Sequence, residues 1–500
     1  MKKLIILLLL IGFAGCDEFL EEDVRGIISP NNFYNSDTEA IQAANGLYNT
    51  FQSNNLYGQW QGISNFTYFG ADVIAPSRVF GGNAAITNYT LTETNYANAY
   101  TVWRELFRVV GDANAVIVNV RDNENLSAAV RNQVIGESLF MRAFAYYHLT
   151  VLWGDVPFYT DNLALGEVAV LGRTDLKTIR TAMIGDLQRV ESENLLPGSH
   201  SAPGDLGRLT VWAAKMLRAK YLLWEEDWAG ARDACVDIIN NSPHRLMDTF
   251  DQVFDINNLY NDEVIWGLDY LKDVENTNRT DSFNPRLRDE PKDSGQRNAL
   301  RNALADRGEE FNGFGLAVPL PAVYENFPDE DLRKPLSCIN EYLGFELKFF
   351  YMPKLWNLDF VNSPRGNHGE WRVIYRLADA YLMAAEAENE LGGPTNAYQY
   401  INEVRERAYE PDQPLAALSQ DEFRTALIDE RKWELAGEDD RRYDLIRWGI
   451  LVETVQNTVY PRHDANINIQ SHHVLLPIPA EEIELNPALL EADPTNNGYR

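Results

Sequence analysis

The sequence predicts a mainly α-helical protein with paired helices and one region of loops and short strands. Over most of the chain, apolar residues recur three and four positions apart, which is the period of an amphipathic helix. Between residues 242 and 365 this pattern gives way to short strand-like runs separated by Gly, Pro, Asn and Asp. Together the two patterns favour a helical scaffold that holds a loop-rich, ligand-facing region.

The ends of several helices are marked by residues that satisfy or interrupt the backbone. Ser36 with Glu39, and Ser419 with Glu422, have the spacing of a capping box. Gly437 and Gly449 are expected to end the last two long helices, because glycine favours the turn beyond a helix. The other expected helices cover residues 95–121, 130–153, 176–193, 209–224, 228–240, 371–391 and 396–408.

Four of these segments form two antiparallel pairs. Residues 209–224 and 228–240 are separated by a three-residue turn, and residues 371–391 and 396–408 by a Gly-Gly-Pro break. Pairs of about 34 residues with small residues at the crossing resemble tetratricopeptide repeats, although no strict period is visible. Helix 130–153 is apolar on several sides and is expected to be buried.

Strands are expected in the loop-rich region, at residues 263–268 and 345–352. Binding groups tend to lie on loops that a rigid scaffold supports. Residues 54–94 and 242–365 are therefore the segments in which we expect functional residues.

The charge balance excludes some classes of function. The chain has 44 Lys and Arg against 74 Asp and Glu, a net charge of −30. Nucleic-acid binding and an anionic-membrane patch both need clustered cations, so we expect neither. The 11 Trp, 24 Tyr and 22 Phe exceed what a core strictly requires, and some are expected to bind ligand.

The N-terminus reads as a targeting segment. Two lysines are followed by a short apolar run, too short to span a bilayer, and by Gly12–Cys16. Residues 13–16 resemble a bacterial lipobox, which implies a signal peptide over residues 1–15 and a lipidated Cys16. The acidic residues 17–22 resemble the signal that sends Bacteroidota lipoproteins to the outer face of the outer membrane. Removal of Lys2 and Lys3 with the leader changes the net charge from −30 to −32.

Cys235 and Cys338 are then the remaining cysteines. They either form a disulfide in an oxidising compartment or stay as two buried thiols, and the sequence leaves both open.

Catalytic and metal-binding motifs are lacking in the sequence. It has no phosphate loop, no GxSxG, no HExxH and no CxxC. His472 and His473 are adjacent and lack the spacing of a helical metal pair. We therefore expect no catalytic residue, no metal site and no cofactor. A structural calcium ion stays open, although no DxDxDG spacing supports it.

Five segments identify a family resemblance. Residues 136–157, from Gly136-Glu137 to Trp153-Gly154-Asp155-Val156-Pro157, are similar to the GEAxFLRAxxYFxLxxxWGDVP motif of the SusD/RagB family. The other segments that agree in order are residues 207–210, 375–387, 430–449 and 476–499.

This resemblance implies a fold, a partner and a function. Family members are α-helical, TPR-like outer-membrane lipoproteins that are exposed to the cell exterior. They act as a lid on a SusC-like TonB-dependent transporter, to which they deliver oligosaccharides or peptides without cleaving them. Residues 16–241 correspond to the N-terminal SusD-like helical region and residues 242–500 to the C-terminal RagB/SusD region, expected to form one compact unit.

The charged residues of the motifs have a structural interpretation. Glu438, Asp439 and Asp440 follow Gly437 at the start of a helix. There the negative charge of a carboxylate interacts favourably with the exposed backbone N–H groups. We expect them to form an ion-pair and capping network with Arg441, Arg442 and Arg447. Arg142 is similarly expected to be a buried, paired cation.

Ligand residues must therefore come from the loops. Sugar rings present apolar faces and hydroxyl edges, so a glycan site needs aromatic platforms beside polar side chains. Segment 57–89 combines these types, and a second group lies around residues 283–356. The candidate ligand-binding residues are Trp60, Tyr68, Phe80, Arg78, Asn83, Phe283 and Trp356.

Two alternatives to a binding and delivery protein stay open at this point. One is a secreted α-helical glycoside hydrolase, which needs two carboxylates about 5–9.5 Å apart in a cleft. The other is a scaffold that gates the transporter and has no ligand of its own. The negative charge favours neutral or cationic cargo over polyanionic glycans.

Overall fold

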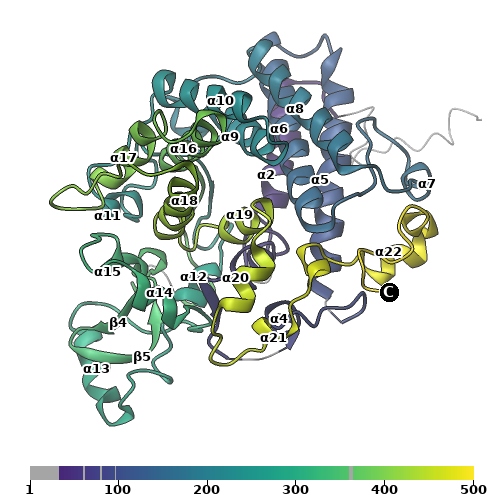
Figure 1. Cartoon of the computed structure of the whole chain (residues 1–500). Helices are drawn as coiled ribbons and strands as arrows, with labels where there is room; N and C mark the ends of the chain where they lie inside the picture. The colour runs from purple at the N-terminus through teal and green to yellow at the C-terminus, as the bar shows by residue number, and fades with distance from the viewer. Residues whose placement is uncertain (1–32, 60–61, 79–80, 96, 360–363) are drawn as a thin grey trace, which may run out of the picture.

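The computed structural model describes residues 33–59, 62–78, 81–95, 97–359 and 364–500. Long helices form an arc of pairs, and short strands and loops lie below one end of it (Figure 1). The predicted mainly α-helical fold is confirmed, whereas the signal peptide and Cys16 lie outside the described residues.

The first part of the arc contains the helices expected from the sequence. Helix α6 is central: it packs against α2, α5 and α8, and every residue from Val134 to Trp153 is buried. It ends where Gly154 adopts a φ of +74°, a conformation that glycine tolerates well. These helices are α2 (Asp37–Gln52), α5 (Ala97–Arg121), α6 (Ala128–Trp153), α8 (Leu176–Ser192), α9 (Val211–Trp224) and α10 (Trp228–Asn241).

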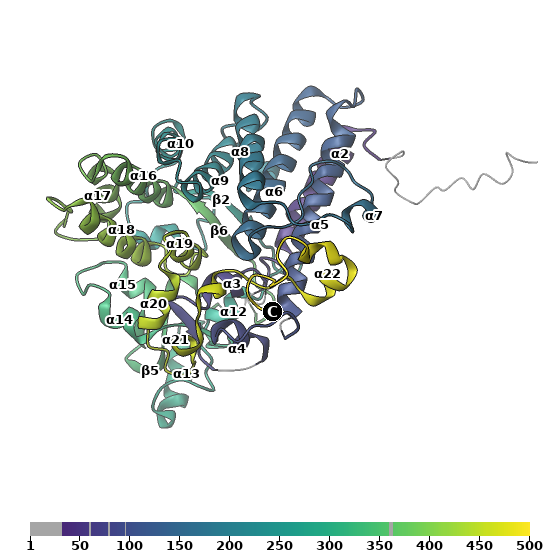
Figure 2. The ribbon, with the colours of Figure 1, turned by 45° about the vertical axis from the view of Figure 1, so that its right-hand side comes forward.

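The second part of the arc joins the first through helix α10, which packs against α16 (Figure 2). Ser419 and Glu422 form the expected capping box at the start of α18. Gly437 and Gly449 both adopt positive φ just beyond helices, as predicted. The helices of this part are α16 (Leu377–Gly392), α17 (Tyr398–Glu406), α18 (Gln420–Glu434), α19 (Arg441–Arg447) and α20 (Leu451–Asn457).

Short elements make up the loop-rich region and the connections. In the described ranges the strands pair antiparallel as β1–β3, β2–β6 and β4–β5. The strands are β1 (Ile74–Pro76), β2 (Val264–Asp269), β3 (Ala317–Pro319), β4 (Ile339–Tyr342), β5 (Phe345–Tyr351) and β6 (Trp371–Arg376). The short helices are α3 (Ser64–Tyr68), α4 (Gly81–Thr87), α7 (Leu165–Val168), α11 (Phe250–Val253), α12 (Arg279–Phe283), α13 (Arg297–Ala305), α14 (Pro321–Asn326), α15 (Lys334–Ser337), α21 (Ala465–Asn468) and α22 (Ala480–Leu485).

One helix boundary was predicted wrongly. Residues 371–391 were expected to form one helix, but Trp371–Arg376 is strand β6 and the helix begins at Leu377. The strand segment is rich in aromatic and β-branched residues, and it pairs with β2, more than 100 positions earlier in the chain. A distant partner strand therefore decided its conformation.

The charged motif residues form a buried ion-pair network, but with other partners than expected. Glu438 binds Lys354 and Arg376, Asp439 binds Arg372, and Asp440 binds Lys220. No side-chain capping bond forms at the start of α19. The carboxylates thus join α19 to distant segments instead of pairing with the neighbouring arginines.

Other buried groups follow the sequence expectations. Arg142 is 4% exposed and bonds Asp186 and Asn114, so it is a buried, paired cation. Cys235 and Cys338 are both buried and unbridged. Of the two alternatives for these cysteines, the structure therefore has the buried thiols.

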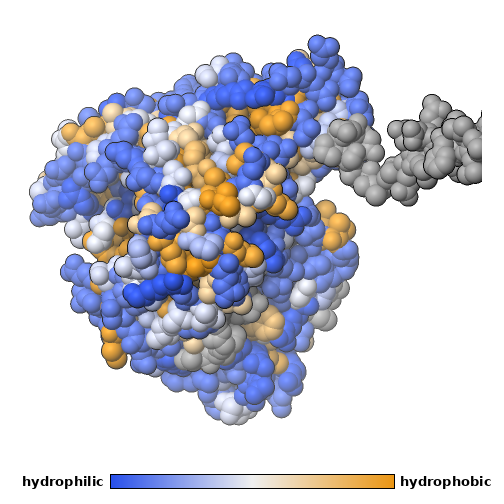
Figure 3. Space-filling model, turned by 90° about the vertical axis from the view of Figure 1, so that its right-hand side faces the viewer, coloured by the Kyte–Doolittle hydropathy of each residue, from blue (hydrophilic) through white to orange (hydrophobic). Residues whose placement is uncertain are grey.

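The outer surface is mostly hydrophilic, as expected from the charge. Figure 3 views the side that carries α7 and α22, where apolar side chains gather among hydrophilic ones. Leu165 and Val170, at and beyond α7, and Leu485 of α22 are strongly exposed. Among the described helices, none is both long and apolar enough to cross a bilayer.

Candidate functional site

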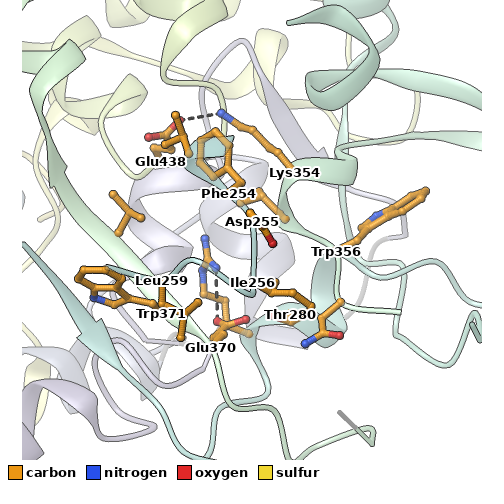
Figure 4. Close-up of a pocket in the computed structure, with 15 residues that line it drawn as sticks. Phe254, Asp255, Ile256, Leu259, Thr280, Lys354, Trp356, Glu370, Trp371 and Glu438 are labelled. Carbon is orange, nitrogen blue, oxygen red and sulfur yellow. Dashed lines mark hydrogen bonds and ion pairs between the residues drawn. The ribbon is translucent and has the colours of Figure 1, made fainter. Parts of the chain in front are cut away.

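A cleft opens where the loop-rich region meets strand β6. Its volume is about 670 Å³, including its open mouth. Five parts of the chain line it: the end of α11 with the segment after it, the start of α12, residues 354–357, residues 370–373, and Glu438 (Figure 4). Segments far apart in the sequence thus meet at one place.

Trp371 forms one end of the cleft. Its indole packs against Tyr260, with the ring centroids 4.2 Å apart. It also lies against Gly267 of β2: a Cβ atom at this glycine would be 2.1 Å from Trp371 Nε1. The absence of a side chain at Gly267 therefore positions the indole.

Trp356 lies at the other end of the cleft (Figure 4). Its Nε1 donates a hydrogen bond to the Phe283 carbonyl at 2.9 Å. Its ring contacts Tyr342 and Tyr351 edge-on, with centroids 5.3 and 5.8 Å away. Because both the ring and the N–H are held, this aromatic wall is fixed in orientation.

Polar groups lie between the two indoles. Arg279 forms an ion pair with Glu370 at 3.4 Å, and Lys354 forms one with Glu438 at 2.7 Å. Burial lowers the pKa of Lys354, and the Glu438 carboxylate offsets this only in part. Asp255 adds a further carboxylate beside the apolar Ile256 and Leu259 (Figure 4).

Asp281, the residue after the cleft residue Thr280, fixes the surrounding loops. It is fully buried, and its carboxylate accepts hydrogen bonds from His368 Nε2 and from the Gly366 N–H, both at 2.7 Å. Its backbone carbonyl accepts a bond from the Phe314 N–H. One buried residue therefore ties two separate loops to α12: its side chain holds the loop of residues 366–368, and its backbone carbonyl holds the loop at Phe314.

Three of the predicted ligand residues come together at this cleft. Trp356 lines it, while Tyr68 and Phe283 are buried behind it, 5% and 1% exposed. Tyr68 Oη accepts a hydrogen bond from Arg279 Nη2 at 3.0 Å, and its ring meets Phe283 edge-on. Tyr68 and Phe283 therefore support cleft residues from behind, whereas Trp356 lines the cleft itself.

Of the other predicted residues, the structure describes the side chain of Arg78 alone. Arg78 lies beside Asp289 and the Phe314 carbonyl. Asn83 belongs to α4, but its side chain is not described. Trp60 and Phe80 lie outside the described residues.

The sequence analysis missed Trp371, Arg279 and Glu370. Trp371 was assigned to a helix, so its place at the open end of a strand was not foreseen. The run of aromatic and β-branched residues, Trp371, Val373, Ile374 and Tyr375, is a sequence signal that could have identified the strand. Nothing near Arg279 in the sequence marks it, because its partners Tyr68 and Glu370 are distant along the chain.

Neither a metal site nor free catalytic carboxylates characterise the described cleft. In the described residues no three or more His, Cys, Asp or Glu are grouped to hold a metal ion. Glu370 and Glu438 are both ion-paired with cations. A fixed aromatic cleft with a few polar groups on a helical scaffold is the architecture of a ligand-binding protein.

Comparison with known proteins identifies the family. The model of the SusD family matches residues 340–499, and a model described as "Starch-binding associating with outer membrane" matches residues 28–223. SusD-like protein P25 of Formosa agariphila is 45% identical to the chain, over 99% of both proteins. A SusD-like protein of Bacteroides ovatus is 26% identical over 89% of this chain and 82% of its own. The chain belongs to the SusD family.

Solved structures agree on the fold. A SusD homolog from Bacteroides thetaiotaomicron superposes with a TM-score of 0.78 at 19% identity, covering 92% of this chain and 97% of its own. Surface glycan-binding protein A of the same organism, solved with laminarihexaose, gives a TM-score of 0.74 at 21% identity, covering 92% and 100%. The family consists of outer-membrane-associated binding proteins, so this chain is not an enzyme, as the sequence predicted.

Proposed function

We propose that the protein is a surface lipoprotein that binds oligosaccharides and delivers them to a SusC-like TonB-dependent transporter in the outer membrane. The observation that carries the proposal is the cleft that has Trp356 and Trp371 at its two ends and polar groups between them. Aromatic faces suit the apolar faces of sugar rings, and the polar groups suit their hydroxyls. A relative of the same fold was solved with laminarihexaose, which supports a glycan as the ligand.

Anchoring, export and domain organisation complete the proposal. Cys16 is the proposed lipidation site, after removal of residues 1–15, and the acidic residues 17–22 are the proposed export signal. Several acyl chains on one cysteine give stable anchoring where a single chain is marginal. The regions 16–241 and 242–500 are proposed to form one unit, exposed to the cell exterior, that covers the transporter as a lid.

The binding site is tested by removing one aromatic face. Glycan-array screening of the purified protein first identifies an oligosaccharide ligand, with laminarihexaose among the probes, and calorimetry measures its affinity. Trp371→Ala is expected to weaken binding by about tenfold or more, because it removes a stacking face at the end of the cleft. Gly267→Ala is expected to weaken binding as well, because the new methyl group displaces the indole.

Trp224→Ala is the matched control. Trp224 is a partly exposed tryptophan at the end of α9 that packs on Arg180 and does not line the cleft. Its variant is expected to retain the affinity. Unchanged affinity in Trp371→Ala would place the ligand elsewhere, and array binding of peptides alone would replace the glycan with a peptide. If the protein binds neither a glycan nor a peptide and the cells still import nutrients at the full rate, the alternative of a gating scaffold without a ligand would be favoured.

A further inference from the structure

Arginines in this acidic chain are commonly held by close carboxylates. Arg208 binds both oxygens of Glu137, at 2.9 and 2.7 Å, and Arg441 binds both oxygens of Asp72, each at 2.8 Å. These are the distances of strong, charge-assisted pairs. Such arginines are neutralised and leave little positive potential for a ligand.

A different arrangement occurs around Asp289. The arginine cluster, as we term it, consists of Arg78, Arg286 and Arg365 around Asp289 and Phe314. Arg78 Nη1 and Arg286 Nη1 both approach the same oxygen, Asp289 Oδ2, at 3.4 and 3.8 Å. Both distances exceed those of the pairs above, and one carboxylate oxygen is shared by two guanidinium groups. At Asp289, one carboxylate therefore faces two guanidinium groups.

Arg365 adds a third guanidinium on an aromatic support. Its guanidinium carbon lies 4.1 Å from the centroid of the Phe314 ring, and the side chain is exposed. The Phe314 carbonyl accepts a hydrogen bond from Arg78 Nη2 at 3.0 Å. Phe314 therefore brings Arg78 and Arg365, nearly 290 positions apart in the sequence, to one place.

The arginine cluster is connected to the cleft through α12. Gly366, next to Arg365, and Phe314 are both bonded to Asp281, which follows the cleft residue Thr280. Burial, together with repulsion from the guanidinium groups of Arg286 and Arg288, lowers the pKa of Arg78. Burial is the largest cause, and the Asp289 carboxylate acts in the opposite direction.

We infer that the protein selects oligosaccharides that carry anionic substituents, either sulfate esters or carboxylates, and that the arginine cluster binds these groups. The inference rests on the proposed glycan-binding function and specifies the class of its ligand. Guanidinium groups present paired N–H donors that match the oxygens of carboxylate and sulfate, and a guanidinium packed on an aromatic ring is held in place for such contacts.

The net charge of the chain points the other way, toward neutral or cationic cargo. Net charge acts at long range, where salt screens it over about 8 Å at physiological ionic strength. Ligand oxygens in contact with the guanidinium groups are much closer than this. The local arrangement therefore outweighs the overall charge.

The test compares anionic and neutral glycans on the same protein. A glycan array with neutral, uronate-containing and sulfated oligosaccharides is expected to give anionic ligands. For the best of them, calorimetry compares the native oligosaccharide with its desulfated or carboxyl-reduced form, which is expected to bind about tenfold more weakly. The form that loses affinity distinguishes sulfate from carboxylate. Raising the salt from about 50 to about 500 mM is expected to weaken binding of the native form only.

Variants of the arginine cluster test whether these arginines bind the anionic groups. Arg78→Gln and Arg365→Gln are each expected to lower the affinity for the anionic ligand by about tenfold and to leave the affinity for its neutral form unchanged. Arg365 is exposed, so its variant keeps the test valid if Arg78→Gln fails to fold. Arg108→Gln is the matched control: this exposed arginine of α5 lies 3.5 and 3.6 Å from two carboxylates, far along the chain from the cluster.

The outcomes separate the two claims. Equal or tighter binding of neutral oligosaccharides would overturn anion selection and leave the glycan-binding function intact. Anion preference that survives both cluster variants would also overturn the role of the arginines. If no oligosaccharide of either kind binds, the proposed function and the inference fail together.

Discussion

Single aromatic residues in this chain have two distinct roles that their identity does not reveal. Tyr68 and Trp356 both belong to aromatic-rich loops, yet Tyr68 is buried and bonds Arg279, whereas Trp356 lines the cleft. Exposure at this scale depends on what the neighbouring segments cover. The surplus of aromatic residues directed attention to the loop-rich region, but it did not separate residues that line the cleft from residues that support them.

Glu290 is a buried carboxyl group next to the arginine cluster. It accepts hydrogen bonds from the Tyr351 hydroxyl at 2.9 Å and from the Lys348 N–H. Burial nevertheless raises the pKa of Glu290 to about 7. The folded protein therefore keeps this proton at pH values where the unfolded chain, with a pKa of about 4.3, has lost it.

This difference predicts a pH-dependent stability. Because the folded state binds the extra proton, the contribution of Glu290 to the free energy of unfolding falls as pH rises from about 4.3 to 7. Glu290→Gln should remove this dependence, and at pH 8 it should be more stable than the wild type by about 2–4 kcal/mol. The amide can accept from Lys348 N–H and donate to Tyr351 Oη, so it fits the same site.

Urea unfolding at about pH 5 and about pH 8 measures the effect. Glu346→Gln, which removes an exposed carboxylate paired with Lys292, is the control and should show little change. An equal stability difference between Glu290→Gln and wild type at both pH values would contradict the prediction.

At the scale of elements, helices were predicted more reliably than strands. Helices α6, α9, α10 and α18 begin and end within about two residues of the expected positions, because caps, turns and periodicity are local signals. Strand β6 was missed because its partner β2 is remote in the sequence. The same error hid Trp371, since an incorrect element places a side chain on an incorrect face.

Two glycines in helices allow the cost of overpacking to be compared with the gain in helix propensity. A Cβ atom at Gly136 of α6 would be 2.9 Å from Leu195 Cβ, whereas at Gly185 of α8 it would meet no atom within 4 Å. Gly185→Ala should stabilise the protein by about 0.5–1 kcal/mol, the helix preference of alanine over glycine. Gly136→Ala should destabilise it by about 1–3 kcal/mol, because overpacking outweighs this gain.

Thermal or urea unfolding of both variants gives the comparison. Stabilisation by Gly136→Ala would mean that the residue 195 loop moves away without cost and that the motif glycine is not needed for close packing. Destabilisation by Gly185→Ala would mean that the exposed face of α8 is covered in the folded protein.

At the scale of the whole molecule, the two halves of the chain are interlocked. Lys220 of α9 binds Asp379 at 2.7 Å and Asp440 at 3.0 Å, in two separate C-terminal helices. Trp153 Nε1 donates to the Pro477 carbonyl at 3.0 Å. The main hydrophobic core runs from Ala40 to Leu489. These contacts support the proposal that residues 16–241 and 242–500 form one unit.

A single cooperative unfolding transition is therefore expected. Calorimetry of the protein should give one peak whose calorimetric and van't Hoff enthalpies agree. A fragment that ends at residue 241 should not fold alone, because it exposes the α10 surface that packs on α16 and leaves Lys220 without its buried carboxylates. Two separate peaks, or a folded fragment, would show that the two regions are independent domains.

The sequence by itself determined the helical scaffold and the family. Capping residues, apolar periodicity and the motif at residues 136–157 depend on neighbours within a few turns, so they can be recognised along the chain. The same local character made the leader and the lipidation signal at Cys16 visible as predictions.

The tertiary structure alone decided which side chains meet. The cleft and the arginine cluster unite residues near positions 78, 280, 314 and 365, and the burial of Tyr68 depends on segments far from it in sequence. The net charge of −30 is a sum over the chain and does not say where the charged side chains lie in the fold. Local potential and exposure depend on distances across the fold, which is why they appeared only in three dimensions.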